Sequence, residues 1–326
     1  LGSGLFLIGL SILYDITGHL LMSPAKEAVA GILADGRYEI PMLVVLAVIS
    51  VGLAIKSGLY PFHYWIPDTY GYATPTASAV LSGLVSKGYI FLLVKIFFRV
   101  LGTENIIDSH MVNVLYIFGI AGMLMGSLHA IRERDTGRMI AYSSVAQIGY
   151  IYMGIGLGTE AGVIAALFHV FTHSATKALL FISAVGLYDV SGGKRDPESL
   201  RGAAYRNPVA GIGFTVGALS MVGFPMLSGF ISKLLFATSA LQSPGKMLPT
   251  LIVLAVSTTL NAVYFLRLVI SVYSRRGVYG EEQAAQPKSS FALRISIVCF
   301  VVLNFILGLA SQPIVGAIRE GLSMFG

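Results

Sequence analysis

Uninterrupted apolar stretches of 18 or more residues recur along this 326-residue chain and constrain its fold more than any other feature. A helix of that length crosses the roughly 30 Å hydrocarbon core of a lipid bilayer. Apolar residues make up 55% of the chain and charged residues only 12%, against roughly 25% charged residues in soluble domains. The sequence therefore predicts a polytopic membrane protein and excludes a soluble enzyme, a disordered protein and a secreted disulfide scaffold.

The net charge of +6 does not indicate nucleic-acid binding, because the basic residues lie inside the apolar segments or in the connections between them. The single cysteine, Cys299, excludes a disulfide framework, a cysteine-rich zinc site and an iron–sulfur cluster. The chain opens at Leu1 in the middle of an apolar run, without the basic region and cleavage site of a signal peptide. We expect it to be a fragment or to follow an earlier part of the protein.

Nine hydrophobic segments without period-2 alternation predict transmembrane α-helices rather than a β-barrel. The segment 209–240 is too long for one crossing and contains GFPMLSGF, from Gly223 to Phe230, which predicts a break near mid-membrane. The segment 41–60 runs into KSGLYPFHYWIP, which predicts a second break. Two interrupted helices in corresponding positions of two halves indicate a transport site. The nine segments are about 1–15, 41–60, 75–101, 112–131, 139–157, 161–188, 209–240, 248–273 and 292–312.

Charges in the connections orient the predicted helices. One set of connections is rich in basic residues and the other carries scattered ones, so the positive-inside rule places the rich set in the cytoplasm. We therefore expect residue 1 near the cytoplasmic face and, after an odd number of crossings, the C-terminus outside. The rich set comprises Arg132, Arg134, Arg138, Lys194, Arg195, Arg201, Arg206, Arg275, Arg276 and Lys288, and the sparse set comprises Lys26, Arg37, Lys246 and Arg319.

Lysines occur deep within the predicted spans: Lys87 midway along 75–101, Lys177 within 161–188, and Lys56 and Lys233 beside the two predicted breaks. None of the sixteen acidic residues lies mid-span. A charge at the bilayer centre costs about 2.5–3.5 kcal/mol. Snorkelling to the interface explains Lys56 and Lys95 equally well, but not Lys87 and Lys177. Burial disfavours a charged lysine and a nearby carboxylate favours it, so a lysine between these effects can relay protons.

The sequence HVFTHSATK places His169, His173 and Lys177 four residues apart, on one stripe of a helix. Imidazoles titrate near physiological pH and can pass protons through a chain of water molecules. The stripe therefore predicts a path for protons.

Three other interpretations of these histidines compete with that path. A zinc metalloprotease requires HExxH, but Val170 follows His169, so this site type is excluded. Haem b ligation would take a histidine from a second helix, for which His129 is the candidate, at the end of its span. Hydrogen bonding between helices accounts for one buried histidine more readily than for a stripe of three polar residues.

The remaining motifs indicate architecture. YPFHYWIPDTY, residues 60–70, suits a helix end in an interfacial aromatic belt, so we expect His63 and Asp68 at the interface. SSVAQIGY, residues 143–150, permits close contact between helices and can hold water. The sequence has neither a phosphate-binding glycine loop nor a Ser/His/Asp arrangement, and we expect no cofactor and no metal.

Four longer motifs, in this order, resemble a single membrane family: KSGLYPFHYWIPDTYGYATPTASAVLSGLVSKGY, DTGRMIAYSSVAQIGYIYMG, HVFTHSATKALLFISAVG and GFPMLSGFISKLLF. They are similar to the antiporter-like subunits shared by respiratory complex I, Mrp-type sodium/proton antiporters and membrane-bound (group 4) hydrogenases. The resemblance covers essentially the whole chain. It implies an all-α membrane fold of about fourteen helices with two inverted repeats, each with a broken helix. The nine segments would be the sixth to fourteenth helices.

The resemblance also implies roles for six residues. Lys56 matches the lysine of the first broken helix, Lys233 the charged residue of the second, and Lys177 the central lysine between them. Some members have a histidine at the position of Ser82, and here Lys87 takes the intramembrane role, as in the D-type chains of Mrp antiporters and the N-type chains of complex I. The complete expected relay is Lys56, Lys87, His169, His173, Lys177 and Lys233.

One residue of the family's pattern has no counterpart in this sequence. A glutamate on the family's fifth helix pairs with the lysine that Lys56 matches, and that helix would lie upstream of Leu1. We expect upstream helices or a separate polypeptide to supply this carboxylate. The resemblance also implies three regions: 1–101, the remainder of the first repeat, broken near 56–61; 102–273, the second repeat, broken near 223–230; and 274–326, a cytoplasmic connection and C-terminal helix.

These observations predict a membrane subunit that moves H⁺, or couples H⁺ to Na⁺, by a relay of lysines, histidines and water. Its expected partners are other antiporter-like and small membrane subunits, the lipid bilayer and a peripheral redox arm of hydrogenase or dehydrogenase type, but no nucleic acid. We expect the driving energy to come from partner subunits, with no redox chemistry in this chain. Two alternatives stay open: a non-pumping structural membrane subunit, and a redox membrane protein that binds haem or quinone through its histidines.

Overall fold

The computed structural model describes residues 1–34, 39–102, 106, 109–274 and 290–324. All regular elements among these residues are helices, and η1 and η2 are π-helical turns. In chain order they are α1 (Gly2–Thr17), α2 (Met22–Ala34), α3 (Glu39–Ser57), α4 (Trp65–Tyr72), α5 (Pro75–Val80), η1 (Leu81–Val85), α6 (Ser86–Ile96), η2 (Phe97–Leu101), α8 (Met111–Arg132), α9 (Thr136–Gly156), α10 (Glu160–Asp189), α11 (Ala203–Arg206), α12 (Pro208–Val222), α13 (Ser228–Ala240), α14 (Pro244–Tyr273), α15 (Phe291–Leu309) and α16 (Ser311–Ser323).

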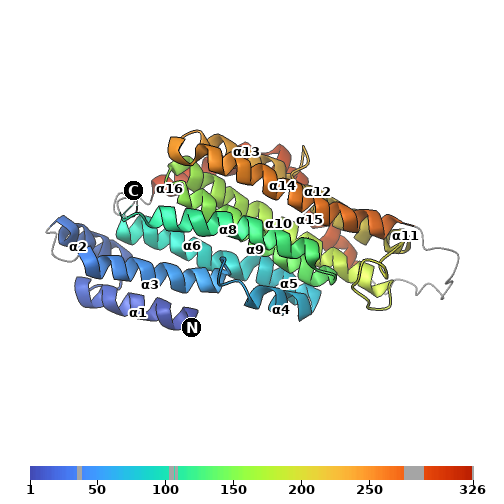
Figure 1. The fold of residues 1–326 in the computed structure, drawn as a ribbon, viewed down its shortest axis with the longest axis horizontal. Helices are drawn as coiled ribbons and strands as arrows, with labels where there is room; N and C mark the ends of the chain where they lie inside the picture. Colours follow the sequence, from blue (N-terminus) through green and yellow to red (C-terminus); the bar gives the residue numbers. More distant parts are fainter. Residues whose placement is uncertain (35–38, 103–105, 107–108, 275–289, 325–326) are drawn as a thin grey trace.

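The helices form an elongated bundle. They run from α1 and α3 at one flank, through α8, α9 and α10 in the middle, to α13 and α14 at the opposite flank (Figure 1). Nearly every side chain of α9 and most of those of α10 are buried, so these two helices form the centre of the bundle. The all-α fold that the apolar segments predict is therefore confirmed for the described residues.

Six helices are long and apolar enough to cross a membrane: α3, the continuous helix over 75–101, α8, α10, α14 and α15. The pair α1 and α2, bent by 65°, adds a seventh if the two form one span. The expected segments 139–157 and 209–240 are also helical, as α9 and as α12 with α13, but they fall outside this set. Nine crossings therefore remain a prediction.

Two helices of 13 residues each, α2 and α16, were not predicted from the apolar pattern. α2 contains Lys26 and Glu27, and α16 contains Arg319 and Glu320, so neither forms a long apolar run. Each has an apolar side that packs against the bundle. In α2 this side includes Val29, and α16 has buried apolar side chains as well. Amphipathic helices of this kind need a period-3.6 search rather than a search for apolar length.

The helix is interrupted within both segments that predict a break. α3 ends at Ser57 and α4 begins at Trp65, and Gly58 just after the end of α3 has a φ of 81°. α12 ends at Val222 and α13 begins at Ser228, and Gly223 has a φ of 94°. Glycine adopts this left-handed conformation at little steric cost, which allows each helix to stop there. The last carbonyls of each interrupted helix then need donors from elsewhere.

α8 and α9 pack with their backbones in direct contact. A Cβ atom on Gly126 of α8 would lie 2.5 Å from the Ala146 nitrogen of α9. A Cβ on Gly149 of α9 would lie 2.6 Å from the Gly119 carbonyl oxygen of α8. Small residues allow such close approach in membrane proteins, where packing replaces the hydrophobic effect as the main force between helices.

Two of the three basic connections lie at the same end of the bundle. The backbone N–H of Thr136, which follows α8, donates to the carbonyl of Arg195, which follows α10 (3.0 Å). This grouping is consistent with the pattern of connection charges. The third basic connection, with Arg275, Arg276 and Lys288, lies outside the described residues, as does most of the connection expected at the start of 274–326.

Candidate functional site

Lys177 lies in the middle of α10 and is fully buried. Its Nζ donates to the Ile140 carbonyl (2.8 Å) and to the Ser143 hydroxyl, both in α9. The centroid of the Phe265 ring lies 6.0 Å from the same nitrogen. These partners are all neutral, so they solvate the ammonium group without neutralising its charge.

Lys87 is buried at the start of α6, directly after the π-helical turn η1. Its Nζ donates to the Ser82 carbonyl, five residues back, and to the Ser86 hydroxyl (3.1 Å). The Ser82 hydroxyl lies 3.0 Å from that of Ser144 in α9. Since Ser144 follows the residue that binds Lys177, adjacent positions of α9 contact the surroundings of both lysines. Single π-helical turns inside α-helices are frequent at functional sites.

His169 and His173 stack on one face of α10, with ring centroids 5.8 Å apart and an interplanar angle of 13°. The His169 Nδ1 forms a 2.6 Å hydrogen bond with the Ser232 hydroxyl of α13. Tyr150 of α9 stacks on His169 at 5.6 Å. His173 is 1% exposed, and neither of its ring nitrogens has a hydrogen-bond partner among the described residues.

Lys233 lies in the second turn of α13, the helix that follows the second break. Its Nζ donates to the carbonyls of Met221 (3.1 Å) and Val222 (2.6 Å), the last two residues of α12. The ammonium group therefore caps the interrupted end of α12, where the helix dipole concentrates partial negative charge. The Tyr150 ring centroid lies 5.9 Å from the same nitrogen.

A small cavity of about 10 Å³ brings His169, His173 and Lys233 together. This volume is close to the smallest that holds one water molecule, about 10–15 Å³. The cavity does not include Lys177, whose ammonium group contacts α9 although its helical position belongs to the same stripe. Its lining consists of Gln147, His169, Thr172, His173, Thr176, Ser220, Met221, Gly229 and Lys233.

Lys56 lies apart from this group, half-buried in the last turn of α3. Its Nζ donates to the Ser3 hydroxyl (2.8 Å) and lies 4.6 Å from the centroid of the Tyr89 ring. Tyr89 lies in α6, the helix that also carries Lys87. Both of these partners are neutral, and the carboxylate that the resemblance implies is not among them.

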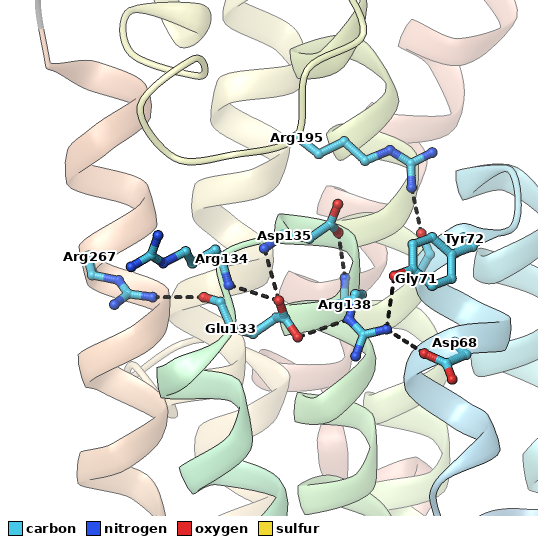
Figure 2. Close-up of polar contacts among 9 residues, drawn as sticks. All are labelled: Asp68, Gly71, Tyr72, Glu133, Arg134, Asp135, Arg138, Arg195 and Arg267. Atoms are coloured by element: carbon cyan, nitrogen blue, oxygen red, sulfur yellow. Dashed lines mark hydrogen bonds and ion pairs between the residues drawn. The ribbon is translucent and has the colours of Figure 1, made fainter.

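A network of charged residues fixes α4, the helix that follows the first break, to the start of α9 (Figure 2). The Arg138 guanidinium donates to the Asp68 carboxylate of α4 and, through Nε, to the Glu133 carboxylate (2.9 Å). The Arg195 Nη1 donates to the Gly71 carbonyl of α4 (2.5 Å). The Asp135 carboxylate accepts from the Arg138 backbone N–H (2.9 Å) and caps α9. Asp68 thus contributes to an ion pair between helices.

The same network sets the charge of Glu133. Burial raises the pKa of this carboxyl, but hydrogen bonds from Arg138 and from the backbone N–H groups of Asp135 and Arg134 outweigh burial and lower the pKa below 4.5. Glu133 is therefore ionised at neutral pH and holds Arg138 in place.

Sequence reasoning missed several polar residues that contact the expected relay. The sequence predicts close helix contact and bound water for the motif with Ser143, Gln147 and Tyr150, but not that these residues contact Lys177, the cavity and His169, respectively. Their spacing of four and three residues places them on one face of α9, a signal that the sequence does contain. Ser232 gave no signal apart from its place next to Lys233. Across the described residues, no three His, Cys, Asp or Glu side chains cluster as metal ligands would.

Comparison with known proteins identifies relatives along nearly the whole chain. The family described as NADH:quinone oxidoreductase/Mrp antiporter, transmembrane, matches residues 1–260. The N subunit of the NADH-quinone oxidoreductase of Desulforudis audaxviator is 32% identical over 326 aligned residues, covering 97% of this chain and 63% of its own length. The D subunit of the Na(+)/H(+) antiporter of Alkalihalophilus pseudofirmus is 27% identical, covering 95% of this chain and 60% of its own length.

The fold has close counterparts among solved structures. A chain of the membrane-bound sulfane sulfur reductase, an archaeal respiratory membrane complex, superposes with a TM-score of 0.85 at 27% identity, covering 99% of this chain and 63% of that chain. The chain therefore spans about three fifths of the length of the proteins that it matches. The family resemblance that the four motifs indicate is confirmed.

Proposed function

The chain belongs to the transmembrane family of NADH:quinone oxidoreductase and Mrp antiporters, and from this we propose that it translocates ions as one membrane subunit of a multisubunit complex. The ion is H⁺, alone or coupled to Na⁺. Relatives named as the N subunit of a quinone oxidoreductase, as the D subunit of an antiporter and as part of a sulfane sulfur reductase complex support this class of machine.

The observation that carries the proposal is the way the buried ammonium groups are bound. The Nζ atoms of Lys87, Lys177 and Lys233 donate to neutral carbonyls and hydroxyls. A carboxylate in direct contact would hold each lysine in its charged form, whereas neutral acceptors leave the proton exchangeable. Buried ionisable residues in a membrane protein that lack a fixed counter-charge mark an ion pathway.

The proposed route follows the order of these groups in the bundle. A proton enters at Lys56, passes through the surroundings of Tyr89 to Lys87, and reaches Lys177 past Ser82, Ser144 and Ser143. From Lys177 it moves along the histidine stripe, through water, to the cavity next to Lys233, where it leaves.

The second helix break gives Lys233 its role. The Met221 and Val222 carbonyls at the end of α12 stabilise its charged form by hydrogen bonding and by the helix dipole. His169 and His173 border the same cavity, so a single water molecule there can exchange a proton with either imidazole or with Lys233.

The proposal includes the wider organisation of the complex. Upstream helices or another polypeptide supply a carboxylate to Lys56, and partner subunits, among them a redox arm of hydrogenase or dehydrogenase type, supply the driving energy. We place the nine crossings within two inverted repeats, the first ending near residue 101 and the second near residue 273. Residue 1 lies near the cytoplasmic face and the C-terminus lies outside.

Replacement of Lys177 or Lys233 by alanine tests the proposal. In the full-length subunit within its native complex, reconstituted into vesicles, either change should abolish ion translocation, because the proton loses its carrier. Lys95→Ala is the matched control, since Lys95 lies near a span end and outside the route. Translocation is measured with a pH-sensitive dye and assembly by native gel electrophoresis.

Each outcome has a defined meaning. Assembled complexes of Lys177→Ala and Lys233→Ala that translocate at the rate of Lys95→Ala would refute the relay and leave a structural membrane subunit. A Soret absorbance band in the purified subunit would instead identify a haem-binding redox protein. Loss of translocation in both variants, with normal assembly and no Soret band, supports the proposal.

A further inference from the structure

Asn304 is a fully buried polar residue in the apolar helix α15. A polar side chain in this environment is costly unless it is hydrogen-bonded, and such residues usually serve a function. The family model matches residues 1–260, so α15 lies outside the part of the chain that this model describes. The role of Asn304 must therefore be inferred from its contacts.

The Asn304 amide connects α15 to two other helices. Its Oδ1 accepts from the Thr176 hydroxyl of α10 (2.8 Å) and from the hydroxyl of Ser228, the first residue of α13 (3.0 Å). Its Nδ2 donates to the Phe300 carbonyl of its own helix (2.9 Å). Both acceptor positions and one donor of the amide are used, which fixes its orientation.

Ser220 extends this cluster to the other side of the helix break. Its hydroxyl, in α12, lies 3.0 Å from that of Ser228 and 3.3 Å from that of Thr176, and it accepts from the Gly229 backbone N–H (3.3 Å). Ser220 and Ser228 lie on opposite sides of the break. The cluster of Asn304, Thr176, Ser220 and Ser228 therefore ties both halves of the broken helix to α10.

Backbone packing holds the same junction. A Cβ atom on Gly308, one turn after Asn304, would lie 2.8 Å from the carbonyl carbon of Leu227 in the break. A Cβ on Gly229 would lie 2.8 Å from the carbonyl carbon of Ser220. One face of α15 thus contacts the break through both an amide side chain and a glycine, and leaves it little room to move.

The cluster also forms part of the wall of the small cavity. Thr176, Ser220 and Gly229 line it together with His173 and Lys233. The carbonyls that bind the Lys233 ammonium group directly follow Ser220 in the chain. A shift of Ser220 relative to Thr176 would therefore change the distance from Lys233 to the histidines.

We propose that Asn304 is a positioning residue for the second half of the relay, holding the two halves of the broken helix against α10 so that Lys233 stays at the cavity. It acts through Thr176 and Ser228 and carries no proton itself. This inference rests on the proposed function, because it assigns Asn304 a part in the same route. It also explains how a helix outside both expected repeats contributes to translocation.

Asn304→Leu replaces the amide by an apolar group with the same branching and number of heavy atoms, and tests this role in the full-length subunit within its native complex. The quantity measured is the number of ions moved per turnover of the partner subunits, because a purely structural defect lowers the amount of complex but not this ratio. We expect this ratio to fall to the value that Lys233→Ala shows, since displacements on the order of 1 Å in a reacting site cost up to about a hundredfold in rate. Ser296→Leu is the matched control on the same helix, where the hydroxyl donates to the Ala292 carbonyl (2.9 Å).

Thr176→Val is nearly isosteric and removes the same hydrogen bond from the α10 side. If Asn304 acts through Thr176, this change alone should lower the ratio similarly, and the double variant should be no worse than either single one. If the complex with Asn304→Leu fails to assemble, the ratio measured for Thr176→Val and Ser228→Ala tests the role of the cluster instead. The inference is overturned if the assembled variants of the cluster keep the wild-type ratio, or if the Asn304 and Thr176 effects multiply.

Failure of this inference is distinguishable from failure of the proposed function. Wild-type translocation in the variants of the cluster, together with its loss in Lys177→Ala and Lys233→Ala, would remove only the role of Asn304. Normal translocation in the two lysine variants would overturn the relay itself, and the role of Asn304 with it.

Discussion

The contact between α8 and α9 makes a quantitative prediction about Gly149. A Cβ atom at this position would lie 2.6 Å from both the Gly119 carbonyl oxygen and the Met123 nitrogen of α8. These are backbone atoms, so no side-chain rotation can relieve the contact. To reach an ordinary separation of 3.4 Å, the two helices must move apart by about 0.8 Å.

Gly149→Ala should therefore destabilise the protein. Overpacking of this kind costs about 1–3 kcal/mol. Alanine in place of glycine within a helix gains about 0.5–1 kcal/mol, which offsets part of that cost. Gly88→Ala is the matched control, because Gly88 lies in α6 and a Cβ atom added there would have no atom within 4 Å, so only the helix term applies.

The two variants are compared by thermal unfolding of the purified subunit in detergent, followed by far-ultraviolet circular dichroism. The difference between them isolates the overpacking term, so Gly149→Ala should be less stable than Gly88→Ala by about 1–3 kcal/mol. Equal midpoints, or a higher midpoint for Gly149→Ala, would refute the direct backbone contact between α8 and α9.

Two further predictions concern polar contacts near the helix ends. Glu133→Gln should lower the free energy of unfolding by about 1–2 kcal/mol at neutral pH. Because the pKa of Glu133 is lowered from 4.5 in the folded protein, this stabilisation is present above that value and is lost as the pH falls below it. Denaturation midpoints of the two proteins should converge in acid; a gap that stays constant with pH would contradict the assignment. Asn207→Ala should cost about 1–2 kcal/mol, since Asn207 caps α12 at the Ala210 N–H (3.3 Å) and donates to the Gly186 carbonyl (3.1 Å). An alanine variant with the same unfolding temperature as the wild type would contradict the cap.

The two helix breaks are features that the local sequence predicts. Gly58 and Gly223 adopt left-handed conformations within the two segments whose glycines and prolines predict interruptions. The local sequence decides where these two helices stop, because glycine tolerates a positive φ and proline lacks a backbone N–H donor. The histidine stripe follows for the same reason, since a spacing of four residues places His169 and His173 on one face.

The partners of the Lys177 ammonium group could not be predicted from helical spacing. Its position in the stripe suggests that it faces the histidines, but its ammonium group binds Ile140 and Ser143 of α9. A long side chain has several rotamers, and the one adopted depends on acceptors that another helix supplies. Helical periodicity fixes the direction of a Cβ atom but not the place of an Nζ atom at the end of four further bonds.

Asn304 likewise shows what tertiary structure adds, because no pattern in the sequence indicates a role for it. It is a single polar residue in an apolar run, and its partners lie 128 and 76 residues away in the chain. The sequence by itself determined the membrane class, the helical state of the nine apolar segments, both breaks and the identity of the buried cations, because these follow from hydropathy and backbone chemistry within one segment. Only the tertiary structure decided which acceptors solvate each ammonium group and which helix holds the second break, because those contacts depend on how distant segments pack.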